Sequence, residues 1–176
     1  MENTSNLKIH LRRIEDSILA SVDRLLGYPL ERHNFKKAHG YALNLANPRS
    51  FNEKICWKKL YDRNPLLPVL ADKHAIRQHI VDVLGADVAQ DLLVPLLYVT
   101  EDPDTIDFDA LPAAFVIKSN HGSGNNIFVR DRTTIDRAEI VRECKAWLKM
   151  PYGVRAHEWA YQHTPRKILI ESMLVD

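Results

Sequence analysis

The residues best suited to chemistry lie in one stretch, FVIKSNHGSGNNIFV, over residues 115–129. Gly122 and Gly124 flank a serine there, and glycines let a backbone bend sharply and approach a ligand closely. Successive backbone N–H groups in such a loop can hold an anion. Lys118 is the one cation of the apolar segment before the loop, and a lysine in such a place needs a negative partner. The stretch therefore predicts an anion site, and a nucleotide phosphate is one candidate ligand.

The elements beside this loop exclude the two commonest phosphate-binding motifs. A P-loop and a dinucleotide-binding fingerprint each need a strand, a loop and then a helix. Here the loop, residues 121–126, lies between predicted strands at 113–120 and 127–131, and no Gly-Lys-Ser/Thr triplet is present. The pattern predicts a β-hairpin whose glycine-containing tip is a flap able to close over phosphates.

Two other interpretations of this hairpin stay open. Glycine and asparagine are common at hairpin tips for conformational reasons alone. Lys118 can also extend to water from the edge of a sheet, with its methylene stem covering apolar neighbours.

The rest of the chain predicts helices first and strands later. Helices are predicted at residues 7–26, from residue 50 to about 64, and at 72–84, with an irregular segment at 27–49. Ser50 and Glu53 form a capping box at the start of the second helix, and Gly85 ends the third. Strands are predicted at 92–100, 113–120, 127–131 and 167–174, with one helix at 135–149. The predicted class is α+β, a helical N-terminal region followed by a mixed sheet.

The composition narrows the classes of function. The chain has 176 residues, 45% of them hydrophobic and 27% charged, with a formal net charge of +1. A nucleic-acid-binding domain normally carries a clear basic excess, so nucleic acid is not expected as a partner. Cys56 and Cys144 do not form a C-x-x-C pair and are interpreted as reduced cysteines. With no signal-like N-terminus and no apolar run of membrane-spanning length, a cytoplasmic location is expected.

Three stretches, taken in order, resemble the ATP-grasp superfamily and more closely its teichuronopeptide-biosynthesis (TupA-like) branch. They are SFNEKICWKKLYDRNPLLPVLADKHAIRQHI, FVIKSNHGSGNNIFV and ILIESMLVD, and the likeness covers about residues 40–176. It implies a lead-in at 1–49, a helical region at 50–100 and a first ATP-grasp subdomain at 101–176, with its sheet incomplete. It also implies ATP as ligand, and a carboxylate–amine ligase of capsule, teichuronopeptide or lipopolysaccharide synthesis.

The resemblance also implies roles for particular residues. Lys73 and Lys118 would contact the phosphates, Lys118 also the adenine edge, and Glu171 would be the hinge acid near adenine. The flap over the phosphates would consist of His121, Gly122, Ser123, Gly124 and Asn125, and the adenine edge would follow the backbone from Ser172 to Leu174. No catalytic residue is assigned.

Each of these roles has a structural alternative. Lys73 could be an exposed lysine at a helix start, and His121 a hydrogen-bonding loop residue. Glu171 could be the ion-pair partner of Arg166 or Lys118.

Magnesium is expected for the full family, with ligands beyond the hinge. The chain is therefore expected to be an N-terminal portion without the metal-binding half, so whether it is an enzyme by itself stays open. A C-terminal partner segment, or self-association through an exposed last strand at 167–174, is expected to complete it.

Two further hypotheses are a glycosyltransferase-like enzyme and a non-catalytic remnant. The first would use a D-x-D metal motif, and Asp102/Asp104 and Asp107/Asp109 have that spacing. Their turn-rich surroundings favour roles as caps and turns.

Overall fold

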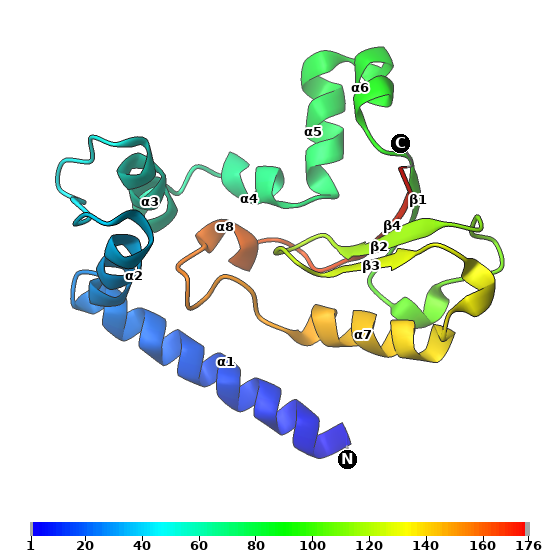
Figure 1. Ribbon diagram of the computed structural model, residues 1–176, viewed down its shortest axis with the longest axis horizontal. Helices are drawn as coiled ribbons and strands as arrows, with labels where there is room; N and C mark the ends of the chain where they lie inside the picture. The colour runs from blue at the N-terminus through cyan, green and yellow to red at the C-terminus, as the bar shows by residue number, and fades with distance from the viewer. Residues whose placement is uncertain (1, 175–176) are drawn as a thin grey trace. The chain divides into compact units, whose positions relative to one another are not determined.

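The computed structural model describes residues 2–174 and has the predicted α+β class (Figure 1). The chain divides into two units. The first runs to Pro65 and includes Pro151–Gln162; the second is Leu66–Met150 together with the residues from His163 onward. No helix among residues 2–174 combines the length and the apolar character needed to cross a membrane.

The first unit is helical. Its helices are α1 (Glu2–Leu25), α2 (Pro29–His39), α3 (Phe51–Tyr61) and the short α8 (Trp159–Gln162). The predicted capping box of α3 is present: Ser50 Oγ accepts from the Glu53 N–H, and the Glu53 carboxylate accepts from the Ser50 N–H. A core joins α2 and α3 to the segments that precede each of them, and its buried residues are Tyr28, Phe35, Leu43, Leu45, Cys56 and Leu60.

The prediction that residues 27–49 are irregular is wrong for Pro29–His39, which form α2. Pro29 ends one helix and begins the next, because its fixed φ suits a first helical position, where no N–H is needed. The Asp23 carboxylate accepts from the Leu30 N–H at 2.7 Å, and Gly40, at φ 80°, ends the helix.

The second unit contains the strands. Its elements are α4 (Leu66–Ala71), α5 (Ala75–Leu84), α6 (Ala86–Leu92), β1 (Leu96–Thr100), β2 (Phe115–Ser119), β3 (Asn126–Val129), α7 (Arg137–Lys149) and β4 (Ile168–Ser172). Two 3₁₀ turns, Pro103–Thr105 and Arg132–Thr134, lie in its loops. The strand predicted at 92–100 begins only at Leu96, because α6 extends to Leu92 and Pro95 lacks an N–H group for a ladder.

The sheet has the strand order β1-β4-β2-β3, and all three pairings are antiparallel. The mixed sheet predicted from the sequence is therefore wrong for the described residues. A parallel pair needs a long crossover, whereas β2 and β3 are joined by residues 120–125 alone. β4 is a central strand, paired with β1 on one side and β2 on the other. The expectation of an exposed last strand is thus contradicted.

The two faces of the sheet differ because side chains alternate along each strand. Phe115, Ile117, Ile168 and Ile170 are fully buried on one face and pack with α7, which lies along the sheet in Figure 1. Lys118, Val116, Leu169 and Glu171 lie on the opposite face, where Lys118 is the most exposed of the four.

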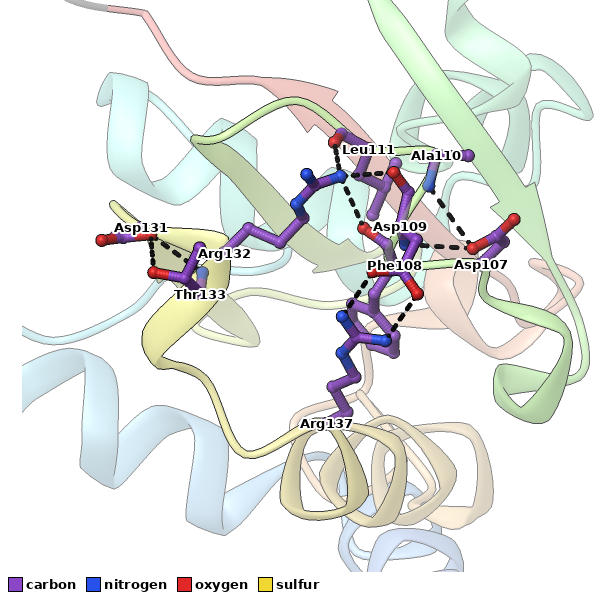
Figure 2. A network of polar contacts seen from close by, with 9 residues as sticks. All are labelled: Asp107, Phe108, Asp109, Ala110, Leu111, Asp131, Arg132, Thr133 and Arg137. Carbon is purple, nitrogen blue, oxygen red and sulfur yellow. Dashed lines mark hydrogen bonds and ion pairs between the residues drawn. The ribbon is translucent and has the colours of Figure 1, made fainter.

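Two arginines fix the loop that leads into β2 (Figure 2). Arg132 Nη1 donates to the carbonyl oxygens of Phe108, Asp109 and Leu111. Arg137 makes two bonds to the Asp109 carboxylate, at 2.6 and 2.9 Å. Planar guanidinium groups suit both arrangements, so they hold this loop against the start of α7.

The four D-x-D aspartates serve this loop and its neighbour. Asp102 and Asp107 each accept an N–H two residues further on, and Asp104 and Asp109 form ion pairs with Lys145 and Arg137. These bonds agree with the predicted cap and turn roles.

Candidate functional site

The first part of the site is a carboxylate held between two cations. Lys118, on β2, and Glu171, on β4, lie on the same face, and their Nζ and Oε2 atoms are 2.7 Å apart. Arg77, on α5, reaches the other oxygen of Glu171 at 3.3 Å and donates to the Val94 carbonyl at 2.6 Å. The ion pair with Lys118 that the sequence offered for Glu171 is therefore confirmed. One carboxylate pairs with two cations, so the three side chains together carry a net positive charge.

A second lysine joins this group from the connector between α4 and α5. The Lys73 N–H donates to the Asn120 carbonyl at 3.1 Å, and Lys73 Nζ donates to the Gly122 carbonyl at 2.5 Å. Burial, and after it the positive charge of Lys118, lowers the pKa of Lys73. The interpretation of Lys73 as an exposed helix-start lysine is contradicted, because the residue is half-buried and bonded to the glycine loop.

Asn120 joins these segments. It is fully buried, and its Nδ2 donates to Asp72 Oδ1 at 2.9 Å and to the Pro165 carbonyl at 2.5 Å. Its Oδ1 accepts from the Lys167 N–H at 2.7 Å. A single amide thus ties the end of β2 to the connector that carries Lys73 and to the start of β4.

The glycine loop is partly interior and partly exposed. Ser119 Oγ donates to the His121 carbonyl at 2.8 Å and accepts from Asn125 Nδ2 at 3.1 Å. Gly122, buried, has a φ of 75°, and Gly124, exposed, has a φ of 87°. A side chain would be strained at both positions. Ser123 is also exposed, so Ser123 and Gly124 form the tip.

His121 differs from the tip because its side chain is buried. It is 2% exposed, and its Nδ1 lies 3.2 Å from Asn120 Oδ1. Burial, and after it the charge of Arg166, lowers the pKa of His121. These contacts agree with the interpretation of His121 as a hydrogen-bonding residue of the loop.

A cavity of about 420 Å³ opens beside Lys118 on the face away from α7. This volume lies in the range usual for small-molecule sites. Its lining comes from β2, β3 and the end of β4: Val94, Val116, Lys118, Phe128, Arg130, Ser172, Met173 and Leu174. The Ser172 N–H donates to the Pro95 carbonyl at 3.0 Å, which fixes this end of β4. Ser172 and Leu174, predicted for the adenine edge, thus share a cavity with Lys118.

Sequence reasoning missed Arg77, Arg130, Asn120 and Asp72. Arg77 meets Glu171 across 94 positions of the chain, and no local pattern indicates such a contact. Arg130 follows β3 on the Lys118 side, which strand alternation could have revealed.

Within residues 2–174, no group of three or more histidine, cysteine, aspartate or glutamate side chains could hold a metal ion.

Comparison with known proteins gives the family of the chain. The model of one protein family, the TupA-like ATP-grasp family, matches residues 53–176. This range includes Lys73, Lys118, the glycine loop and Glu171. The chain belongs to the TupA-like ATP-grasp family. No curated protein and no solved structure matches it.

Proposed function

We propose that this chain supplies the nucleotide-binding part of an ATP-grasp-type carboxylate–amine ligase. Membership of the TupA-like family supports this proposal. The observation that carries it is that Lys118 lines the cavity, while Lys73, whose charge interacts with that of Lys118, is bonded to the glycine loop. The proposed setting, bacterial cell-surface polysaccharide synthesis in the cytoplasm, rests on the family resemblance alone.

The residues have separate roles in this proposal. Lys73 and Lys118 hold the phosphates, since both carry ammonium groups on the site side of the sheet and Glu171 neutralises only part of the charge. The loop from His121 to Asn125 is the flap, with Ser123 and Gly124 as its exposed tip and Gly122 bonded to Lys73. The backbone from Ser172 to Leu174 lies along the adenine edge, at the cavity that Lys118 also lines.

Glu171 holds the two neighbouring cations in position before nucleotide binds. Its carboxylate holds Lys118 and Arg77 in place, which limits the side-chain entropy that binding must remove. An anion close to Lys118 then competes with Glu171 for the ammonium group. Glu171 thereby positions the cations and moderates their affinity for phosphate.

Bound ATP would supply the phosphoryl group that activates a carboxylate for attack by an amine. The described residues bind and orient the nucleotide in this scheme.

Isothermal titration of ATP into the purified chain tests the proposal. A charge-assisted contact is worth about 1.5–3 kcal/mol, so Lys118→Ala and Lys73→Ala should each weaken binding about 10- to 100-fold. Lys58→Ala is the matched control, since Lys58 lies on α3, in the other unit, and pairs with Asp62 just after that helix. Unchanged affinity in Lys118→Ala, or no binding by the folded chain, refutes the proposal. Preference for a nucleotide-sugar over ATP would favour the glycosyltransferase hypothesis.

A further inference from the structure

One surface of the first unit carries apolar side chains that the fold does not use. Six of them line one side of α1 and are 46–86% exposed: Leu7, Leu11, Ile14, Ile18, Val22 and Leu25. We call these residues the α1 stripe. Ala20 and Asp23, on the opposite side of the helix, are buried. α1 therefore attaches to its unit through small and polar residues and turns its apolar side to solvent.

Five of the six residues of the α1 stripe have the spacing of a coiled coil, with Ser21 in place of Val22 at the remaining position. Leu7, Leu11, Ile14, Ile18, Ser21 and Leu25 follow one another at alternating steps of four and three residues. This is a heptad repeat, which keeps a narrow seam facing a single partner helix. Ser21 fits the seam because its hydroxyl donates to the Ser17 carbonyl of the same helix at 2.8 Å. From Leu7 to Leu25 the seam is about 27 Å long.

The charges on α1 favour a protein partner over a membrane surface. Helices that lie on membranes usually have a polar face rich in lysine and arginine. The exposed or half-buried charged residues of α1 have both signs, with Arg12, Arg13 and Arg24 against Glu15 and Asp16. Such mixed charges are usual on the outer positions of coiled coils.

A second copy of this chain satisfies the flanking positions in one orientation only. In a parallel pair of identical helices, the flanking residue directly before a seam residue such as Leu11 lies beside the residue five positions further along the other helix. His10 then meets Glu15 of the partner subunit, and an imidazole N–H can donate to a carboxylate. An antiparallel pair with the same seam would place Glu15 opposite Glu15 of the partner subunit and His10 near Arg24 of the partner subunit.

We propose that α1 is a homodimerisation element, which pairs with α1 of a second copy as a short parallel coiled coil. This proposal is independent of nucleotide binding, because no residue of the α1 stripe belongs to the ATP site. A seam of fewer than three heptads gives modest affinity, so the dimer forms reversibly with concentration.

Sedimentation equilibrium from about 1 to about 200 µM provides the test, because micromolar association is resolved in that range. The weight-average mass should rise from the 20.3 kDa of one chain toward twice that value. The double variant Ile14→Asp/Ile18→Asp should weaken association at least about 100-fold. Arg12→Asp, which puts the same group on the same helix away from the seam, should leave it unchanged. Circular dichroism checks that each variant is folded.

A cysteine cross-link tests the orientation without disturbing the apolar side chains. A parallel pair brings the two copies of residue 21 together, so Ser21→Cys should give a disulfide-linked dimer under mild oxidation. Arg12→Cys should not. The native Cys56 and Cys144 are buried and do not compete. A wild-type chain that stays monomeric, or equal cross-linking of the two variants, overturns the proposal. The proposal is also overturned if no dimer forms and the wild-type chain instead binds vesicles of phosphatidylcholine and phosphatidylglycerol, with Ile14→Asp/Ile18→Asp abolishing that binding.

Discussion

Replacing Asn120 by alanine should destabilise the second unit more than any other neutral substitution near the site. The Asn120 side chain donates to Asp72 and Pro165, accepts from the Lys167 N–H and lies 3.2 Å from His121 Nδ1. Alanine removes all of these contacts, and two of the partners, Asp72 and His121, are buried. The Lys73 connector and the start of β4 then lose their common anchor.

The size of the effect follows from the partners that are left. A net hydrogen bond is worth about 1 kcal/mol, and a buried group left without a partner costs about 1–3 kcal/mol. The Asp72 carboxylate still accepts from the His74 N–H at 2.8 Å, which limits the loss. We expect a decrease of about 3 kcal/mol in the free energy of unfolding, and a melting temperature lower by about 6–12 °C.

Thermal and urea denaturation measure this change, with Asn126→Ala as the control because Asn126 is exposed on β3. Asn120→Asp should destabilise the unit further, since it puts a carboxylate oxygen beside Asp72 where an amide nitrogen now lies 2.9 Å away. A loss below about 1 kcal/mol, no larger than that of Asn126→Ala, would refute the role given to Asn120.

Three further predictions concern other parts of the chain. Backbone N–H groups, first that of Ser50, lower the pKa of Glu53 from 4.5 to about 2. The contribution of Glu53 to stability is therefore present above pH 4.5 and lost toward pH 2. Acid titration of the wild type should show that loss of stability, and a Glu53→Gln variant that keeps the full loss would contradict the prediction. Arg132→Lys should cost about 1–2 kcal/mol in urea denaturation, because the shorter lysine side chain places its ammonium group further from the carbonyl oxygens that Arg132 Nη1 reaches (Figure 2). A neutral result would contradict this role of Arg132. Burial raises the pKa of Cys56 and of Cys144 to about 12. Neither thiol should therefore react with a disulfide reagent at pH 8 before the chain is denatured. Rapid reaction of the native chain would contradict this prediction.

Local signals in the sequence predicted the local parts of the fold. Ser50 and Glu53 form the expected capping box, since both lie within one helical turn. Alternation along β2 puts Lys118 and Val116 on one face and Phe115 and Ile117 on the other. β2 and β3 pair as predicted from the short glycine-containing loop between them. In each case the determining contacts span only a few residues.

What the sequence could not predict depends on distant contacts. β4 lies between β1 and β2 because its Ile168 and Ile170 complete a core with α7, and hydrophobicity alone does not order strands. The bond between Arg77 and Glu171 likewise joins residues far apart in the chain. Pro29 was misinterpreted for another reason, since proline both ends one helix and suits the first turn of the next.

The proposed contact of Lys73 and Lys118 with the phosphates of ATP can be measured directly. An ATP derivative with an acyl group on its terminal phosphate transfers that group to a lysine amine lying beside the phosphates, and mass spectrometry of the digested chain locates the modified residues. We predict acylation at Lys73 or Lys118 that excess ATP suppresses, with Lys58 unaffected by ATP. Burial and the charge of Lys118 lower the pKa of Lys73, which favours the reactive neutral amine there. Modification spread over exposed lysines such as Lys58, unchanged by ATP, would contradict the account.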